Sequence, residues 1–545
     1  MTFADWALPA MPYLTVMPIV LPALAAGLIA LFRGVNLQRT IALATLAALT
    51  VIAAVMIIVA DTHGIQTVQM GGWDAPVGIT MVADRLSSIM LFVSSIVLFA
   101  VMWYGISQGL RDGDEDDPVA VFLPTYMLLT LGVNLSFLAG DLFNLYVGFE
   151  VFLVASYVLL TLGASPQRVR AGIGYTLVSL ASSMIFLFGL ALVYASTGTV
   201  NMAQAGERMS ELPSGTSAAI FATFIVAFGI KAAIFPLDAW LPDSYPTAAS
   251  IVTAVFAGLL TKVGVYAIIR VRSTVFTDGS LDSTLMVVAL LTMIVGVMGA
   301  IAQNDIKRLM SFTLVSHIGY MIFGLGLATE AGLAATVYYV AHHITVQTAL
   351  FLVTGLIENR AGTANIDRLG SLAKVSPFVS VLFLVPALNL GGIPPFSGFL
   401  GKVGLLRGGV EQATPLAYTL VGVSLLVSLL TLLVVVRVWT RAFWRRVEDV
   451  EHPPAQLVAA YERAVARGER PRPLEPGLVL PTTALVGLTL VFTVAAGPLF
   501  ALADEAATDM LDRSPYIAAV LAQALAGLAL GFVTGVLLSA IEMAG

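Results

Sequence analysis

Three of the five lysines in this 545-residue chain lie inside long apolar runs, where a charged side chain is costly. They are Lys231, Lys262 and Lys402. A desolvated lysine can release its proton, whereas arginine effectively cannot. The use of lysine at these positions therefore indicates groups that change their protonation state.

Glu150 is the clearest carboxylate inside an apolar run, the segment "DLFNLYVGFEVFLVASYVLL". A lone charge at that depth costs at least a few kcal/mol, so a partner is expected. Lys231 is the natural partner, and a Glu150–Lys231 pair that separates and rejoins would form a proton site that can be loaded and unloaded. The alternative is a static structural ion pair.

The other two lysines carry the same chemistry with their own alternatives. Lys262 lies well inside "AGLLTKVGVYAIIR", although a lysine near a helix end can extend its ammonium group to the interface. Lys402 lies near the end of the run "LNLGGIPPFSGFLGKVGLL", so the same alternative is stronger for it. We expect both to be proton-translocating groups.

Histidine titrates near neutral pH and can pass a proton through its two ring nitrogens. His317 lies in "SFTLVSHIGYMIFG", and His342 and His343 lie together in "YYVAHHITVQTALFLVTG". Neighbouring residues point about 100° apart on a helix, so both cannot face one interior path. We favour His317 and His343 as relay groups, with hydrogen-bonded packing as the alternative. A bis-histidine haem has little support from this spacing.

Prolines interrupt two of the apolar runs close to the lysines. Pro236 follows Lys231 by five residues, and Pro394 and Pro395 precede Lys402. Proline has no N–H and breaks the helical hydrogen-bond ladder. Interrupted helices at membrane depth line cavities or transport paths, although a simple packing kink is the alternative.

Composition identifies the chain as an integral membrane protein. Its hydrophobic fraction is 58%, its charged fraction 11% and its mean hydropathy +0.93. The absence of cysteine excludes thiolate metal sites, iron–sulfur clusters and disulfides. No cofactor or metal is expected, and a net charge of −6 argues against nucleic acid as a partner. The apolar N-terminal run is too long for a signal peptide and is expected to remain as the first span.

Fourteen runs are long enough to cross a bilayer, which takes roughly 20 residues each. They are 8–32, 41–60, 86–107, 119–139, 143–163, 172–196, 218–236, 247–269, 284–302, 309–329, 332–357, 376–400, 416–437 and 478–502. A further run at 520–541 is either a fifteenth span or an interfacial segment.

The basic residues orient these spans. With the N-terminus outside, 18 basic residues fall in cytoplasmic loops. Six fall outside: Arg85, Arg208, Arg270, Arg272, Arg407 and Arg513. This asymmetry follows the positive-inside rule and predicts a multi-pass protein of the bacterial plasma membrane with its N-terminus outside.

The motifs "GIKAAIFPLDAWLPDSYPTAAS", "AIAQNDIKRLMSFTLVSHIGYMIFG" and "LNLGGIPPFSGFLGKVGLL" resemble the antiporter-like subunits shared by respiratory complex I and the Mrp (multiple resistance and pH) sodium/proton antiporters. The run "FAGLLTKVGVYAIIR" looks most like the D-type Mrp subunits, and the resemblance covers most of residues 80–440. It implies an all-α polytopic membrane protein of about 14 transmembrane helices, with 15 as the alternative count, two inverted five-helix repeats and broken helices 7 and 12.

The resemblance also divides the chain into segments. It implies an N-terminal three-helix segment at 1–110, a first antiporter-like repeat at 119–270, a second at 284–440, a cytoplasmic loop at 441–477 and C-terminal helices at 478–545.

Residue roles follow from the same resemblance. It implies that Glu150 and Lys231 form the family's glutamate–lysine pair, that Lys262 is a bridging lysine and that Lys402 ends the second half. His317 and His343 match central relay positions. Two positions depart from relatives of the family. Asp238 replaces a frequent histidine and is expected to be solvated, and Gln347 replaces a frequent lysine.

The expected function is that of a proton-translocating subunit of a multi-subunit sodium/proton antiporter, a secondary transporter component rather than an enzyme. The implied partners are the other Mrp subunits (A, B, C, E, F and G), together with protons, sodium and the bilayer. One alternative is a proton-pumping subunit of a complex I-type oxidoreductase. The other is a scaffold subunit that transports nothing.

Overall fold

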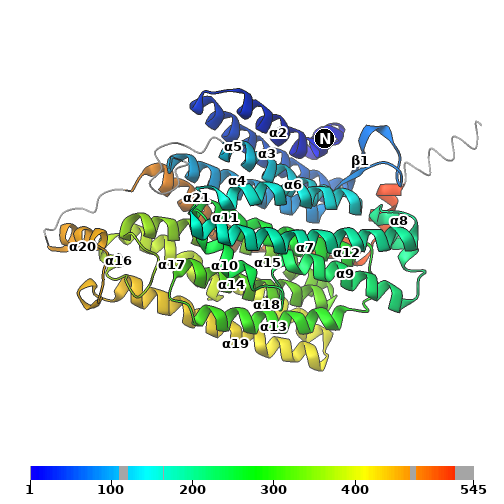
Figure 1. The fold of residues 1–545 in the computed structure, drawn as a ribbon. Coiled ribbons are helices and arrows are strands. Elements are labelled where there is room, and N and C mark those ends of the chain that lie inside the picture. The colour runs from blue at the N-terminus through cyan, green and yellow to red at the C-terminus, as the bar shows by residue number, and fades with distance from the viewer. Residues whose placement is uncertain (1, 110–120, 164, 467–473, 522–545) are drawn as a thin grey trace, which may run out of the picture.

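Long helices run roughly side by side through the computed structural model of the chain (Figure 1). The structure describes residues 2–109, 121–163, 165–466 and 474–521. A two-stranded antiparallel hairpin and α8 lie at one end of the bundle, called here the hairpin end, and α16 and α20 lie at the opposite end, called the α20 end.

The first part of the chain forms α1 (Phe3–Ala7), η1 (Leu8–Ala10), α2 (Met11–Leu31), α3 (Val35–His63), β1 (Gln66–Gln69), η2 (Met70–Gly72), β2 (Thr80–Ala83), α4 (Arg85–Ser107), α5 (Phe122–Leu138), α6 (Leu142–Thr161), α7 (Pro166–Thr197), α8 (Met202–Met209), α9 (Ser214–Ala232), α10 (Trp240–Ser244), η3 (Tyr245–Thr247), α11 (Ser250–Val255), η4 (Phe256–Leu260) and α12 (Thr261–Thr274).

The second part forms α13 (Asp282–Ile301), α14 (Ile306–Leu327), α15 (Glu330–Ala361), α16 (Leu372–Val375), α17 (Pro377–Gly391), α18 (Ser397–Gln412), α19 (Pro415–Val438), η5 (Trp439–Trp444), η6 (Val447–Asp449), α20 (Ala455–Tyr461), η7 (Glu462–Ala466), α21 (Pro476–Val494) and α22 (Ala496–Leu511).

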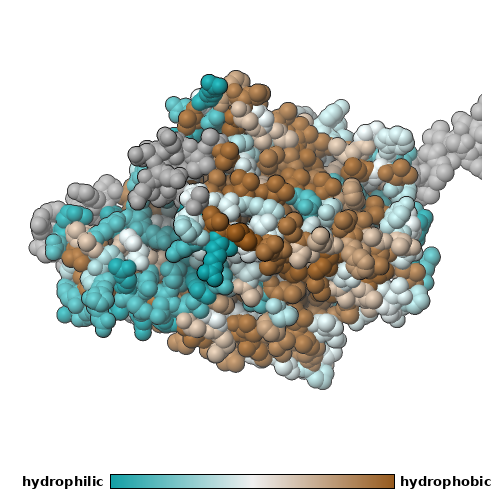
Figure 2. Space-filling model, viewed as in Figure 1, coloured by the Kyte–Doolittle hydropathy of each residue, from teal (hydrophilic) through white to brown (hydrophobic). Residues whose placement is uncertain are grey.

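Apolar helices of the described residues coincide with all fourteen expected spans. Twelve are long and apolar enough to cross a membrane, and the shorter apolar helices α5 and α17 supply the other two. Hydrophobic side chains cover the middle of the visible face, and hydrophilic ones gather at the α20 end (Figure 2). The run at 520–541 lies almost entirely outside the described residues.

Both expected helix breaks are present. Helix α9 ends at Ala232, Ala233 adopts a left-handed conformation, and Pro236 lies in the connection to α10. Helix α17 ends at Gly391, Gly392 has a φ of 76°, and Pro394–Pro395 separates it from α18. The twelfth span is therefore two helices, and Lys402 lies within the second of them rather than at the end of one run.

Helices α11, η4 and α12 form the continuous helix Ser250–Thr274, which is longer than the expected span at 247–269. The expectation that Arg270 and Arg272 lie in a loop outside the spans is therefore wrong, since both lie in this helix. Arg270 lies inside α12 and is only 3% exposed. The expected span ended at 269 because the last turn of the helix carries charged and polar residues, which lower the hydropathy. One of them, Arg270, is buried in an ion pair with Asp84.

A common spacing of 164 residues relates two parts of the fold. Isolated antiparallel bridges join Asp141 to Asn201 and Asp305 to Asn365. The first bridge encloses α6 and α7, and the second encloses α14 and α15. Helices α7 and α15 are both 32 residues long and begin 164 residues apart. The first bridge lies next to β2, and the second lies near α16 at the other end of the bundle. This arrangement is what two inverted repeats would produce.

Three helices make up the interior. The apolar stretch of Ser250–Thr274 and that of α15 are entirely buried, and α14 is nearly so. In contrast, one face of α7 exposes large apolar side chains such as Ile173, Leu177 and Met184. The buried helices are the ones that carry Lys262 and the three interior histidines, so these side chains are held away from the lipid-facing surface.

Candidate functional site

Lys231 lies at the C-terminal end of α9, where the helix breaks. Its side chain is buried among protein atoms, and its Nζ lies 5.9 Å from the centre of the Tyr175 ring. No described residue accepts a hydrogen bond from this Nζ. A helix C-terminus carries partial negative charge from its unpaired carbonyls, so this position favours an ammonium group.

Glu150 of α6 is half-buried and accepts a hydrogen bond from the Ser183 hydroxyl of α7. It interacts electrostatically with Lys231, but the two do not form the direct ion pair that the sequence suggested. Ser183 therefore holds the carboxylate while the lysine remains without a direct partner.

Lys262 lies in the first turn of α12, directly after a local change in helix type. The segment η4 is π-helical, and the Lys262 Nζ donates a 2.6 Å hydrogen bond to the Ala257 carbonyl within it. A π turn disturbs the regular ladder of backbone hydrogen bonds, and such turns are frequent at functional sites. Here the carbonyl satisfies an ammonium group that is fully buried.

Close packing joins the elements of Lys231 and Lys262. Gly264 faces the end of α9, and a Cβ at this position would lie 2.7 Å from the Ala232 backbone nitrogen. A glycine is needed for this approach because any side chain would push the two helices apart. The break in α9 is therefore held against the turn of α12 that follows Lys262.

His317 and His343 face each other across α14 and α15, with ring centres 5.1 Å apart. The Tyr339 hydroxyl lies 2.7 Å from His317 Nδ1. Both histidines are fully buried, and His317 Nε2 and both nitrogens of His343 have no hydrogen-bond partner in the described chain. His343 interacts electrostatically with both Lys262 and Lys402.

His342 contacts a different set of side chains from His343, because neighbouring residues point in different directions on a helix. The set around His342 is also polar. His342 Nδ1 lies 3.0 Å from the Ser397 hydroxyl, the first residue after the α17 break. Ser397 in turn donates to the Asn389 amide oxygen at 3.1 Å. His342 therefore links the interior histidines to the second broken helix, a role that the preference for His343 passed over.

Lys402 caps the broken end of α17. Its Nζ donates to the Ser428 hydroxyl at 2.9 Å and to the Leu390 carbonyl at 3.2 Å, and it lies 5.0 Å from the centre of the Tyr320 ring. The carbonyls at a helix C-terminus lack intrahelical donors. The break thus creates the acceptors that hold this lysine inside the protein.

A series of buried polar atoms along these helices lacks a hydrogen bond to any described residue: Lys231 Nζ, Thr261 Oγ1, His317 Nε2, His342 Nε2, His343 Nδ1, His343 Nε2 and Gln347 Oε1. Buried polar groups in native proteins are nearly always paired with protein or with water. In a native protein the missing partners of such atoms would be water molecules.

Some partners could not be anticipated from the sequence. Tyr339, Ser183 and Ser397 have no distinctive pattern, because serine and tyrosine are common in apolar helices and only packing selects them. Asp238 is only 6% exposed, so the expectation that it is solvated is wrong. Gln347 donates to the Met310 carbonyl at 2.9 Å and leaves its Oε1 free.

Comparison with known protein families shows the family of this chain. Residues 139–431 match the protein family described as NADH:quinone oxidoreductase/Mrp antiporter, transmembrane region. The chain belongs to this family. All six predicted site residues, from Glu150 to Lys402, lie within the matched range.

Within the family, similar proteins include the D-type subunit of the Na(+)/H(+) antiporter of Alkalihalophilus pseudofirmus, which is 35% identical over 512 residues, 93% of this chain and 99% of that protein. The corresponding D-type antiporter protein of Bacillus subtilis is 33% identical over 510 residues, with the same coverage.

Solved structures of the family agree. A chain of the Mrp complex from Dietzia sp. DQ12-45-1b superposes with a TM-score of 0.83 at 32% identity, covering 93% of this chain and 99% of that one. A chain of respiratory complex I from Thermus thermophilus shares the fold, with a TM-score of 0.72 at 23% identity over 91% of this chain and all of that one.

Proposed function

We propose that this chain is a proton-translocating subunit of a multi-subunit sodium/proton antiporter. One observation carries the proposal: Lys231, Lys262, His317, His343 and Lys402 are all buried, and Lys231 Nζ and three of the four ring nitrogens of the two histidines have no hydrogen bond to a described residue. The antiporter subunits to which the chain is similar over nearly its whole length support it.

Each side chain has a separate task in the proposed relay. Glu150 and Lys231 load a proton together, since movement of one charge changes the proton affinity of the other. Lys262 passes the proton toward the histidines, whose two nitrogens can accept and release it on opposite sides. Lys402 ends the relay where its ammonium group is held by the α17 carbonyls.

The relay uses both repeats. In this proposal the first repeat, at 119–270, supplies Glu150, Lys231 and Lys262, and the second, at 284–440, supplies the histidines and Lys402. The common 164-residue spacing supports this division. Both broken helices then place a C-terminal end beside a translocating lysine, as expected for transporters built from repeats.

Sodium needs several oxygen ligands, and the described residues contain no group of three or more His, Asp or Glu side chains placed to hold a metal ion. We propose that sodium passes through partner subunits, namely the A, B, C, E, F and G proteins of one hetero-oligomeric Mrp complex. The hairpin end, with the N-terminus, would face the outside, because the basic loops gather at the α20 end.

The complex I-type pump remains the second candidate because the fold is shared with complex I. The genes that accompany this one distinguish the two. Cysteine-rich iron–sulfur proteins would favour the oxidoreductase, and small hydrophobic subunits would favour the antiporter.

The direct test is sodium and proton flux in vesicles that contain the whole complex. Lys231→Ala is expected to abolish exchange while the complex still assembles. Lys374→Ala, which changes an exposed lysine outside the spans, is the matched control and should leave exchange unchanged. Normal exchange by an assembled Lys231→Ala complex would mean that the chain is a scaffold.

A further inference from the structure

One face of α12 carries polar groups from the membrane interior to the hairpin end. Lys262, Tyr266 and Arg270 are spaced four residues apart, so they lie along the same side of the helix. Arg270 is eight residues from Lys262, which is about 12 Å of helix rise. The proposed relay does not use Tyr266 or Arg270.

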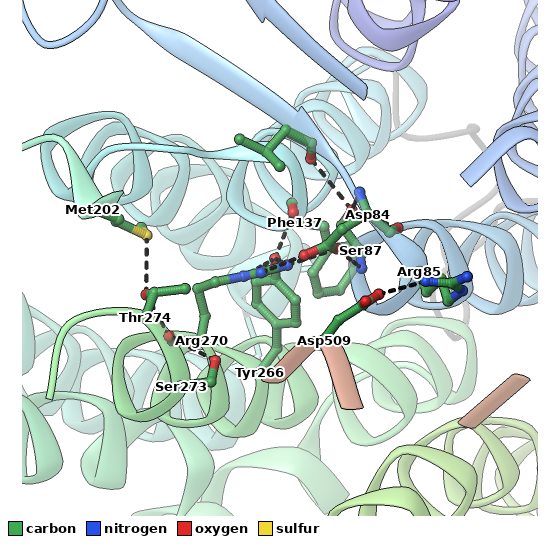
Figure 3. A network of polar contacts seen from close by, with 11 residues as sticks. Asp84, Arg85, Ser87, Phe137, Met202, Tyr266, Arg270, Ser273, Thr274 and Asp509 are labelled. Atoms are coloured by element: carbon green, nitrogen blue, oxygen red, sulfur yellow. Dashed lines mark hydrogen bonds and ion pairs between the residues drawn. The ribbon is translucent and has the colours of Figure 1, made fainter. Parts of the chain in front are cut away.

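Arg270 is held on several sides by protein groups (Figure 3). Its guanidinium donates to both oxygens of Asp84 at 2.5 and 2.9 Å, and to the Tyr266 hydroxyl at 3.0 and 2.9 Å. Tyr266 then donates to the Phe137 carbonyl at 2.6 Å. Asp84 and Arg270 are 5% and 3% exposed, so this ion pair is shielded from both water and lipid.

Four separate parts of the chain meet at this ion pair. Asp84 caps α4, Phe137 belongs to α5, Tyr266 and Arg270 belong to α12, and Tyr516 lies over the guanidinium at 5.7 Å. The segment after α22 that contains Tyr516 is attached to β1 by hydrogen bonds from Thr67 and Gln69 to the carbonyls of Ala519 and Val520. The cluster therefore closes the bundle between α12 and the hairpin.

A small cavity of about 10 Å³ lies directly beside the ion pair. It is lined by Asp84, Arg270, Asp509, Arg513 and Tyr516 among others. Its size is at the lower limit for one water molecule. The buried Tyr516 hydroxyl is the polar atom of this lining that no described residue bonds.

Acidic side chains lead from the surface to this cavity. Side-chain exposure falls from 62% at Glu505 to 21% at Asp509 and 6% at Asp84. Arg85 connects the first two of these to α4, with its guanidinium 2.8 Å from Asp509 and 3.8 Å from Glu505. Arg85 and Arg270 offset most of the charge of these carboxylates, so the row is polar rather than strongly negative.

We propose that the Asp84–Arg270–Tyr266 cluster is the seal that closes the proton route of the first half toward the hairpin end, with the cavity beside Tyr516 as its outer water position. The inference rests on the proposed function. In the closed state the seal separates Lys262 from the surface that carries Glu505 and Asp509. When the Asp84–Arg270 ion pair opens, protons can reach α12. A guanidinium suits this task because it keeps its charge and binds both carboxylate oxygens at once.

The test measures passive proton entry into vesicles that contain the whole complex, without sodium. Arg270→Gln is expected to dissipate an imposed pH gradient severalfold faster than the unmodified complex. Arg272→Gln is the matched control, because Arg272 lies on the same helix but is not part of the seal. Its guanidinium instead pairs with the Asp282 carboxylate at 2.6 Å. An assembled Arg270→Gln complex that is as proton-tight as the Arg272→Gln complex would overturn the proposal.

Tyr516→Phe decides the case if Arg270→Gln does not assemble. This change removes a hydroxyl without a protein partner, so a purely structural cluster predicts normal exchange. The seal predicts that Tyr516→Phe slows exchange severalfold. The control Tyr418→Phe, at an exposed tyrosine on α19, should exchange at the normal rate. Normal exchange by Tyr516→Phe would overturn the proposal.

Failure of the seal and failure of the relay are distinguishable. If Lys231→Ala abolishes exchange while Arg270→Gln causes no leak and Tyr516→Phe exchanges normally, only the seal is wrong. If assembled Lys231→Ala exchanges normally, the relay is wrong whatever the leak measurements show.

Discussion

At the scale of single residues, this protein uses its buried cations in two ways. Lys231, Lys262 and Lys402 each meet carbonyls, hydroxyls or an aromatic ring but no direct carboxylate partner in the described chain. Arg270 meets Asp84 through two hydrogen bonds. A buried cation without a counter-ion is costly unless it can lose its charge, which lysine can do and arginine cannot.

Tyr339 is expected to position His317 for proton transfer. Tyr339→Phe removes the hydroxyl 2.7 Å from His317 Nδ1 and leaves the ring in place. Loss of one hydrogen bond of about 1 kcal/mol should slow exchange about fivefold. Tyr338→Phe is the matched control, since its hydroxyl donates to the Phe492 carbonyl instead. Equal effects of the two changes on vesicle exchange would contradict the positioning role.

Asp141 should make stability depend on pH. Burial raises the pKa of its carboxyl to about 6, although backbone N–H groups favour the ionised form. The folded state then holds a proton that the unfolded state releases, so stability falls as pH rises from about 4 through about 6, by at most about 3 kcal/mol.

The measurement for Asp141 is the melting temperature of the purified complex at pH 5 and pH 7. Asn also caps helices well, so Asp141→Asn should keep the cap of α6 while removing the titrating group. We expect a smaller decrease in melting temperature between the two pH values for this variant. An identical decrease would exclude Asp141 as the source.

At the scale of elements, helix ends and irregular turns supply the acceptors that the buried lysines need. The end of α17 presents the Leu390 carbonyl to Lys402, and the π turn η4 presents the Ala257 carbonyl to Lys262. A regular helix would use both carbonyls in its own ladder. The cost of interrupting each helix is therefore offset by binding an ammonium group.

The contact between α12 and the end of α9 should tolerate no added side chain. A Cβ at Gly264 would lie 2.7 Å from the Ala232 nitrogen and 3.1 Å from the Lys231 carbonyl carbon. Overpacking of this kind typically costs about 1–3 kcal/mol. Gly264→Ala should lower both the melting temperature and the exchange rate. Gly422→Ala, which adds a methyl group in open space on α19, should change neither.

Sequence patterns predicted the elements well because the bilayer imposes a strong constraint on them. Apolar runs located every span, and Pro236 and Pro394–Pro395 located both breaks. The end of the eighth span was missed because Arg270 lowers local hydropathy, and its ion pair with Asp84, far away in the sequence, could not be foreseen. The π turn at Phe256–Leu260 has no sequence signal at all.

The candidate site was predictable by residue type but not by contact. A charge or histidine inside an apolar run is rare enough to be noticed. The partner of such a residue cannot be recognised in the sequence, because contacts such as Glu150 with Ser183 or His342 with Ser397 join different helices. Such contacts depend on the rotation and depth of each helix, which a single sequence does not determine.

At the scale of the whole molecule, the proposed relay runs through both repeats, with His317 and His343 between the lysines of the two halves. In this proposal the first half contributes groups up to Lys262 and the second half ends at Lys402, and His317 interacts electrostatically with both lysines. If protons pass through the halves in series, a change at either end should stop the entire transfer. Parallel routes would instead leave part of the activity after each change.

The most direct test of this account is sodium/proton exchange by assembled complexes with Lys262→Ala, Lys402→Ala or both changes. A series route predicts that each single change abolishes exchange and that the double change adds no further loss. Substantial exchange that persists after each single change and disappears only in the double variant would contradict the single route through both halves.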